Sequence, residues 1–478
     1  MQSCSDNEPT PNNSAIYNVE KGVVMQLGKK LENPYSVKNI EKKALENLKK
    51  SKLGAAMATE DLKIITTHLY VKFIPKTEQE KDNLMIDSSL VLYDYPLDYE
   101  IQVTGDYYRD PLTPADQPTP QYCAVKVDDV YYAPTNRIGN SNSTNATMRK
   151  IIGKMVSAAL IDALVEEALR ITNNLSTSST ANITGKTMNN SWRPAGRIRV
   201  WDDFMQNFVG VEDAQVRARR WFTTHRGSVG ADGFYSCDGT FKSEANYSID
   251  WDRYDFALQD HWLNGATFNG PKREGNWDLN LRDDKQEYYA TIFRAAHHYY
   301  YKDIKGLRRP PQNSFWKTKM KIKAFYESNS ESNGSHLEER RFLGAQIKIY
   351  NSQNPTIEIY ATTIHELAHA SHWNMSGSDF DNSETKVKES WAAGVEWELT
   401  RVVYPNYSRG YNNRYTGVVV DMIDVVSGND QVEGYTIRQI EDALNGEKSW
   451  INWRNNIKNR YNNATENNLD ALFNTWDF

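Results

Sequence analysis

The sequence has few cysteines, no long apolar run and no excess of basic residues. Its 478 residues include three cysteines, and none stands at the spacing of a metal-binding cysteine pair. This absence argues against a zinc site built from thiolates. Cys123 and Cys237 fall in different predicted domains, so we expect two free, buried thiols rather than a disulfide.

Long hydrophobic runs and a strong positive charge are also missing. No apolar run approaches the roughly 18 residues that a membrane-spanning helix needs. The most apolar stretch, residues 155–169, is interrupted by Asp162, Glu166 and Glu167, which is typical of an amphipathic helix. Lys and Arg number 56 against 62 Asp and Glu, a formal net charge of −6. We therefore predict no transmembrane helix and no nucleic-acid partner.

The sequence does contain one metal-binding motif. The pentapeptide His-Glu-Leu-Ala-His is an HExxH pattern inside a segment of helical character, bounded by Pro355 and Gly377. Positions four apart lie on the same face of a helix, so the imidazoles of His365 and His369 point the same way. Such a pair can hold a zinc ion while the intervening Glu366 acts as a general base.

A catalytic zinc ion normally takes three protein ligands, so a third residue must come from elsewhere. His372 is the nearest histidine, and it lies two turns beyond His365 on the same face. On a straight helix that position moves away from an ion held by His365 and His369. We expect His372 to be a supporting or an ordinary surface residue.

Glu389 is the better candidate for the third ligand. A turn-forming segment, residues 377–383, separates it from the motif and lets a second helix return antiparallel beside the first. Two alanines stand one turn beyond Glu389, and their small side chains permit close approach of the two helices. Glu384 and Glu396 compete for the same role.

This arrangement resembles the gluzincin class of zinc metallopeptidases, in which HExxH is followed by a second helix with an ExxA or ExxD pattern. Here HELAH precedes Glu-Ser-Trp-Ala, which begins at Glu389, and the likeness is best between residues 348 and 401. The resemblance implies that His365, His369 and Glu389 hold Zn²⁺. It also implies that Glu366 activates a water molecule.

The chain departs from the class at one position. Thermolysin-like members carry a downstream histidine that stabilises the oxyanion, whereas this chain has no histidine after His372. A tyrosine hydroxyl can donate an equivalent hydrogen bond. Tyr411 and Tyr415 are the candidates, and we assign this catalytic role to Tyr415.

The rest of the chain predicts a multidomain α+β protein. We expect a flexible lipoprotein-like tail (1–33), an N-terminal α+β domain (34–190), a small β-sandwich (194–258) and a mainly helical, zincin-like metallopeptidase domain (280–478). Alternating short strands and Gly/Asp turns predict the sandwich. That region resembles the transthyretin-like, carboxypeptidase-regulatory-like module, which implies a supporting role.

Local patterns place individual elements. They predict helices at 34–50, 77–85, 148–171, 290–301, 418–426, 436–444 and 449–461, strands at 68–74, 89–93, 99–103, 122–127 and 320–326, and a linker at 173–190. Residues 346–350 precede the motif helix, where gluzincins have an edge strand that aligns extended substrate. By this analogy we expect residues 346–350 to bind a peptide backbone by strand addition.

Cys4 stands in a different context from the other two cysteines. It follows Ser3 and precedes a polar tail that reaches about Ser14. This start resembles that of a mature bacterial lipoprotein, in which the cysteine carries lipid. The resemblance implies a lipid anchor in the bacterial outer membrane, facing the cell surface or the periplasm, without a transmembrane helix.

These features predict a zinc-dependent metallopeptidase tethered at the bacterial surface, acting on a protein, a peptide or a glycoprotein. Two alternatives remain open. The first is a non-catalytic surface lipoprotein that binds glycan or protein and retains the metal site as architecture. The second is a zinc hydrolase that cleaves a bond other than a peptide bond, because the ligand set alone does not specify the substrate.

Overall fold

The computed structural model describes residues 24–50, 63–126, 146–152, 158–174, 191–260, 265–314, 319–326, 333–340, 344–426 and 430–477. Cys4, the expected tail up to residue 23 and nearly all of the expected linker at 173–190 lie outside these residues. The lipid anchor therefore stays a prediction. Among the described helices, none combines the length and the hydropathy that a bilayer crossing requires.

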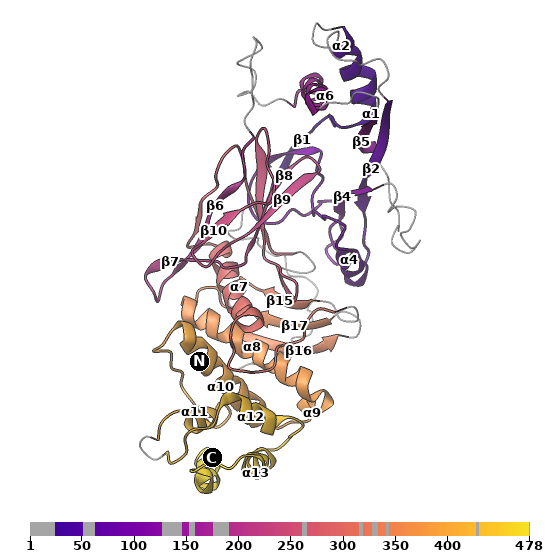
Figure 1. Cartoon of the computed structure of the whole chain (residues 1–478). Helices are drawn as coiled ribbons and strands as arrows, with labels where there is room; N and C mark the ends of the chain where they lie inside the picture. The colour runs from indigo at the N-terminus through magenta and orange to yellow at the C-terminus, as the bar shows by residue number, and fades with distance from the viewer. Residues whose placement is uncertain are drawn as a thin grey trace.

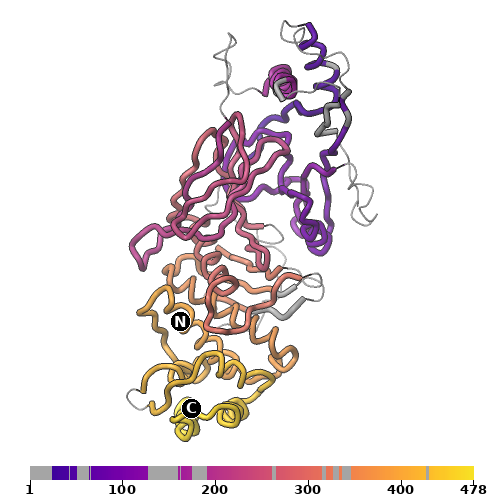
Figure 2. The backbone as a smooth tube through the Cα atoms, in the orientation of Figure 1, coloured from indigo at the N-terminus to yellow at the C-terminus, as the bar shows by residue number. Residues whose placement is uncertain are grey.

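The described residues form a mixed fold of helices and several sheets, consistent with a multidomain α+β protein. The chain follows the length of the molecule: N-terminal elements gather at one end, strands in the middle and helices at the other end (Figures 1 and 2). Buried side chains from Ile198 to Phe473 form one continuous hydrophobic core. The N-terminal elements instead have four smaller clusters.

The N-terminal elements differ from the sequence prediction in three places. Residues 26–30 of the expected tail form β1 (Gln26–Lys30), which pairs with β3 (Tyr99–Val103). The expected long helix at 148–171 is split into β5 (Ala146–Ile152) and α6 (Ala158–Ile171). The expected strand at 89–93 forms only one bridge, at Tyr93.

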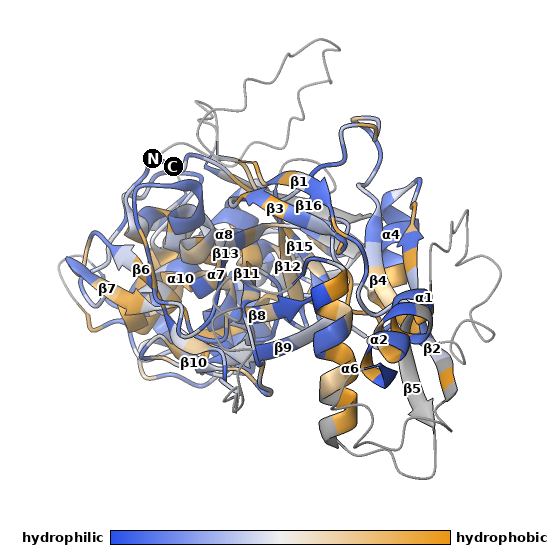
Figure 3. Ribbon diagram, turned by 90° about the horizontal axis from the view of Figure 1, so that it is seen from above, coloured by the Kyte–Doolittle hydropathy of each residue, from blue (hydrophilic) through white to orange (hydrophobic). Residues whose placement is uncertain are grey.

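Non-local pairing explains the split of the expected helix. β2 (Lys63–Phe73) lies between β4 (Gln121–Lys126) and β5, and both pairs are antiparallel. Residues 146–152 are therefore taken up by a ladder whose partner is far away in sequence, which overrides local helical preference. The rest of the segment, α6, packs its apolar side against α2 (Leu45–Lys49) and the adjoining turn of helix (Figure 3).

Two four-stranded sheets occupy the middle of the molecule. One has the order β10-β6-β14 with β7 also pairing with β6, and the other has the order β13-β11-β8-β9. Their bounds are β6 (Ala195–Asp202), β7 (Asn207–Gly210), β8 (Gln215–Arg220), β9 (Thr223–Ser228), β10 (Phe234–Ser236), β11 (Ala245–Asp250), β13 (Thr267–Arg273) and β14 (Leu279–Leu281). Strand pairing thus continues past residue 258. Cys123 and Cys237 are buried and free, as expected.

A third four-stranded sheet supports the helices at the C-terminal end. Its order is β12 (Phe256–Gln259), β15 (Met320–Ala324), β17 (Gly344–Ile349) and β16 (Gly334–Arg340). The first three strands are parallel, and β16 runs antiparallel to β17. The expectation that residues 346–350 form an edge strand is wrong, because β17 is paired on both sides. β16 ends the sheet instead.

Helices make up most of the C-terminal end, and two of them, α7 (Lys285–Tyr301) and α8 (Thr356–Ser376), contact this sheet. The others are α9 (Ser378–Asp381), α10 (Thr385–Val403), α11 (Val418–Ile423), α12 (Ile437–Leu444), α13 (Trp450–Arg460) and α14 (Leu469–Thr475). The helices expected at 290–301, 418–426, 436–444 and 449–461 are confirmed within a few residues. α8 contacts α7, α10, β16 and β17 (Figure 1).

A buried ionic group ties the N-terminal elements to this sheet. Met320 and Ile322 of β15 are buried in the continuous core, whereas Lys321 between them points to the opposite face. There its Nζ lies 2.6 Å from Oε1 of Glu78 and also pairs with Asp82, both from α4 (Glu78–Met85). Lys321 is 3 % exposed, so this ion-paired group is buried between α4 and the sheet.

We expect Lys321→Ala to destabilise the protein by about 3–5 kcal/mol, because it removes the buried ammonium that pairs directly with two carboxylates of little exposure. Lys302→Ala is the matched control. Lys302 lies 2.5 Å from Glu212, but its side chain is 44 % exposed, and such a pair contributes at most about 1 kcal/mol. Thermal and urea unfolding of both variants give the comparison. Equal losses in the two variants contradict the prediction.

Candidate metal centre

The HExxH motif lies in the middle of a buried helix. α8 begins at Thr356, directly after Pro355, and ends at Gly377, where the backbone φ of 55° suits a residue without a side chain. These bounds confirm the helix that the sequence predicts. His365, Glu366 and His369 are 3 %, 0 % and 4 % exposed, so the motif is enclosed rather than displayed on the surface.

The second helix, α10, returns antiparallel beside α8. His369 contacts Glu389, and His365, which precedes it, contacts both Glu389 and the later residue Glu396. Contacts that run in opposite order along two helices require opposite helix directions. The alanines one turn beyond Glu389 are fully buried, and Gly394 beside them is where α11 packs: a Cβ there would lie 2.2 Å from Val419. The two alanines are thus buried, and the small residue beside them allows the close approach of α11.

Three side chains converge at the crossing of these helices. Oε2 of Glu389 lies 3.2 Å from Nε2 of His365 and 3.2 Å from Nε2 of His369. One nitrogen or oxygen atom from each of the three residues lies within 4.8 Å of the other two. The three residues selected from sequence are thus brought together, and Glu389 is 3 % exposed.

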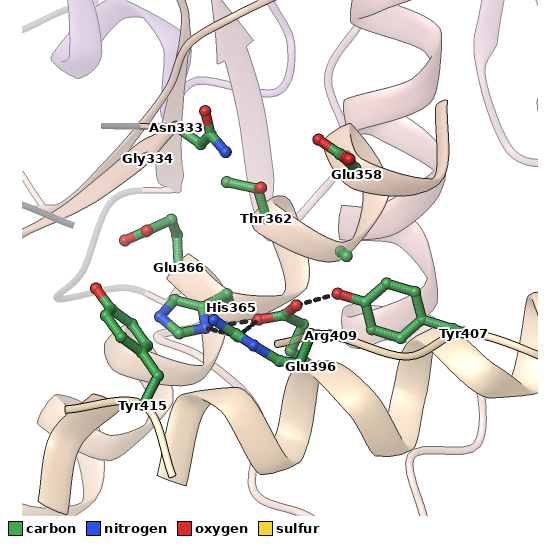
Figure 4. A pocket seen from close by; sticks show the side chains of 11 residues that line it. Asn333, Gly334, Glu358, Thr362, His365, Glu366, Glu396, Tyr407, Arg409 and Tyr415 are labelled. Atoms are coloured by element: carbon green, nitrogen blue, oxygen red, sulfur yellow. Dashed lines mark hydrogen bonds and ion pairs between the residues drawn. The ribbon is translucent and has the colours of Figure 1, made fainter. Parts of the chain in front are cut away.

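Glu396 holds His365 from the opposite side. Its Oε2 lies 2.8 Å from Nδ1 of His365, and the same carboxylate accepts hydrogen bonds from the hydroxyl of Tyr407 and the guanidinium of Arg409 (Figure 4). With Nδ1 committed to Glu396, the ring presents Nε2 to Glu389. A carboxylate behind a histidine fixes the tautomer and orientation of a metal ligand in this way.

These carboxylates dominate the local electrostatics. Although burial alone would lower it, Glu389 and Glu396 raise the pKa of His365 to about 9. Burial also opposes ionisation of the two carboxyls, yet His369 and His365 hold the pKa of Glu389 well below its ordinary value. Arg409, with His365, lowers the pKa of Glu396. The centre is therefore built around two ionised carboxylates, an environment that attracts a cation.

A cavity opens beside His365. It is lined by residues of α8, by the start of β16 and by the segment from Tyr407 to Tyr415 (Figure 4). Glu366 and Tyr415 both line this cavity, and the ring of Tyr415 lies 5.9 Å from that of His365. Tyr411, the other tyrosine considered from sequence, packs 5.9 Å from Trp476 and is not among the lining residues. The geometry therefore favours Tyr415.

The start of β16 passes very close to Glu366. A Cβ atom on Gly334 would lie 2.7 Å from Cγ and from Oε1 of Glu366. Only glycine permits this approach without displacing the carboxylate. The strand at the end of the sheet is consequently in contact with the glutamate of the HExxH motif.

The remaining candidates from sequence lie elsewhere. His372 is 1 % exposed and packs 5.0 Å from Phe380, so the expectation of a surface position is wrong. Burial lowers its pKa to about 3, and it is not part of the converging group. Glu384 caps another segment, accepting a hydrogen bond from the backbone N–H of Trp450 at 3.0 Å.

Sequence reasoning missed the positioning role of Glu396, which it weighed only as a rival ligand. The available signal was its spacing: Glu396 follows Glu389 by two helical turns, so both carboxylates lie on the α10 face that meets α8. Arg409 was missed altogether. It reaches Glu396 from a loop, and no periodic pattern links a loop residue to a distant helix.

The donor set suits zinc. Two imidazole nitrogens and one glutamate oxygen are the ligands of a class of catalytic zinc sites, and the second oxygen of Glu389 lies 3.4 Å from Arg414. A separate group, Asp421, Asp424 and Asp430, offers carboxylates alone and is only half-buried. Acidic groups of that kind are common on surfaces without an ion, so the assignment rests with the first group.

Comparisons with protein-family models, with curated proteins and with solved structures found no match to this chain.

We expect Glu396→Gln to weaken metal binding about 10–100-fold, because the amide no longer orients His365 as a carboxylate does. Competition with a chelator of known affinity measures the change, and circular dichroism checks that the fold persists. Glu384→Gln, at the residue directly before the same helix and outside the centre, should bind metal as the wild type does. If both variants bind the metal with equal affinity, Glu396 does not contribute to metal binding.

Proposed function

We propose that the chain is a zinc-dependent metallopeptidase. The observation that carries this proposal is the convergence of His365, His369 and Glu389 at one point, with Glu366 and Tyr415 lining the adjoining cavity. His365, His369 and Glu389 would hold the ion. When bound, Zn²⁺ supplies Lewis-acid polarisation of the scissile carbonyl and makes water more acidic.

Glu366 is the proposed general base. It is fully buried and lines the cavity one residue from a proposed ligand, His365. Its carboxylate takes the proton of the attacking water and passes it to the departing amine, so the one group serves as base and then as acid. Burial beside Gly334 keeps bulk water away from this carboxylate and fixes its position.

Tyr415 is the proposed donor to the developing oxyanion. Its backbone N–H donates to Oδ1 of Asn412 at 2.9 Å, and Arg409 lies over its ring at 5.2 Å. These contacts hold the ring beside His365, where its hydroxyl can donate as negative charge forms on the carbonyl oxygen. This residue takes the place of the histidine that thermolysin-like enzymes use.

Peptide is the substrate class that the sheet supports best. β16 ends the sheet and its first residue, Gly334, contacts Glu366. An extended peptide that adds to the outer side of the strand after Gly334 brings its backbone past the cavity. The sequence analogy placed backbone binding at residues 346–350, whereas we now propose it for the neighbouring strand, β16.

We expect Glu366→Gln to bind one zinc ion per chain as the wild type does, yet to hydrolyse peptides at least about 100-fold more slowly. His365→Ala is the companion variant, and it should lose both zinc and hydrolysis. Elemental analysis of the purified proteins measures zinc, and a peptide-library digest with and without chelator measures cleavage.

The two variants also separate the rival functions. Peptide hydrolysis by Glu366→Gln at the wild-type rate would contradict the peptidase proposal. A wild-type protein that holds zinc but cleaves no peptide, with or without chelator, would favour the non-catalytic binding protein or hydrolysis of another bond.

We expect Tyr415→Phe to lower kcat about 10²–10³-fold with little change in KM, because it removes a hydrogen bond that forms only in the transition state. Tyr411→Phe is the control, since that ring packs on Trp476 outside the cavity. Steady-state kinetics on one cleaved peptide give both constants. A loss confined to KM would make Tyr415 a binding residue instead.

A further inference from the structure

The cavity has a second carboxylate, Glu358, that the proposed mechanism does not use. Glu358 lies on α8 one turn before Thr362 and two turns before His365, so the three residues follow one face of the helix. All three line the cavity, and Figure 4 shows Thr362 between Glu358 and Glu366. The carboxylate thus stands at one end of the space that begins beside His365.

Glu358 differs from the other acidic residues of the cavity in its partners. Glu396 is held by Arg409, Tyr407 and His365. Glu366 carries the proposed proton transfer. For the half-buried side chain of Glu358, no hydrogen bond or ion pair is found with any residue in the described part of the chain. Its negative charge is left for a group that enters from outside.

A position in the first turn of a helix is a partial explanation of this residue. A carboxylate there interacts favourably with the helix dipole, by a few tenths of a kcal/mol up to about 1 kcal/mol. The helix dipole explains why a carboxylate is favourable at this position, but it does not explain why the carboxylate of Glu358 lines a cavity next to the proposed catalytic centre. Stability and substrate selection can therefore be separated by experiment.

The spacing indicates which cation fits. Seven residues of helix at 1.5 Å each place Glu358 about 10 Å from His365 along the axis. The α-ammonium of a residue at the scissile bond would lie too close to His365 to reach that far. A lysine or arginine side chain spans the interval, because its long stem carries the charge away from the backbone.

We propose that Glu358 selects substrates with a lysine or arginine side chain next to the scissile bond. This inference rests on the proposed peptidase function and names its substrate class. Glu358 lines the same cavity as Glu366 and His365, so a side chain that enters this cavity can meet its carboxylate. Thr362 and Asn333 supply polar walls between Glu358 and the centre.

The first experiment compares two peptides that differ at one residue, lysine or its uncharged isostere norleucine, both with acetylated N-termini. We expect the zinc-loaded wild type to cleave the lysine peptide with a kcat/KM about 10–100-fold higher, as for a hydrogen bond to a charged group. Glu358→Gln should lose this preference while still cleaving the norleucine peptide, and Glu358→Arg should prefer a glutamate peptide.

A second experiment measures binding without turnover. Glu366→Gln should bind the lysine peptide more tightly than the norleucine peptide, and the double variant Glu366→Gln with Glu358→Gln should bind the two equally. Glu287→Gln is the matched control. Glu287 holds the same third position of α7, is half-buried and lies outside the cavity, so it shares the helix-end effect with Glu358, although its carboxylate also accepts a hydrogen bond from the backbone N–H of Asp283.

The outcomes separate the two proposals. Cleavage of both peptides at equal rates, or a lysine preference that persists in Glu358→Gln, overturns the selection by Glu358 and leaves the peptidase intact. Cleavage that requires a free N-terminus also overturns it, because the α-ammonium is then the group recognised. Absence of any peptide hydrolysis by the zinc-loaded wild type overturns the peptidase proposal and this inference with it.

Discussion

The imidazole of His365 lies between two carboxylates of the same neighbouring helix. Glu389 faces its Nε2 at 3.2 Å and Glu396 faces its Nδ1 at 2.8 Å. These glutamates are two turns apart on α10, so α8 must cross α10 at a register that places His365 between them. A shift of one turn would remove Glu389 from His369 and Glu396 from His365 together.

Burial of so much charge depends on compensation from loops. Glu366, Glu389 and Glu396 are each at most 5 % exposed. Two guanidinium groups, Arg409 and Arg414, contact Glu396 and Glu389, so three carboxylates face two cations. The two histidines lie among these charges, and a bound cation would take the place of their protons. The loop from 404 to 417 thus completes the centre that the helices begin.

The sequence allowed the helices and the converging residues to be predicted, because helical period and motif spacing are local properties. α8 has the expected bounds, and His365, His369 and Glu389 meet as expected. Features that depend on contacts between distant parts of the chain could not be predicted from the sequence. Residues 146–152 form a strand because a distant strand pairs with them. The edge strand of the third sheet is β16, and the sequence does not show which of β16 and β17 lies at the edge. Arg409 and Glu396 needed tertiary contacts to be recognised.

A single helix carries the proposed base, two proposed ligands and the carboxylate of Glu358, for which the described residues offer no partner, and this arrangement constrains the proposed chemistry. α8 is buried against α7, α10 and the sheet, so its residues cannot move independently of one another. The distance from Glu358 to His365 is consequently set by helix pitch rather than by a mobile loop. On the proposed function, a substrate whose cation reaches Glu358 would have its backbone placed at a fixed distance from the centre, and a substrate with a shorter side chain would gain no such placement.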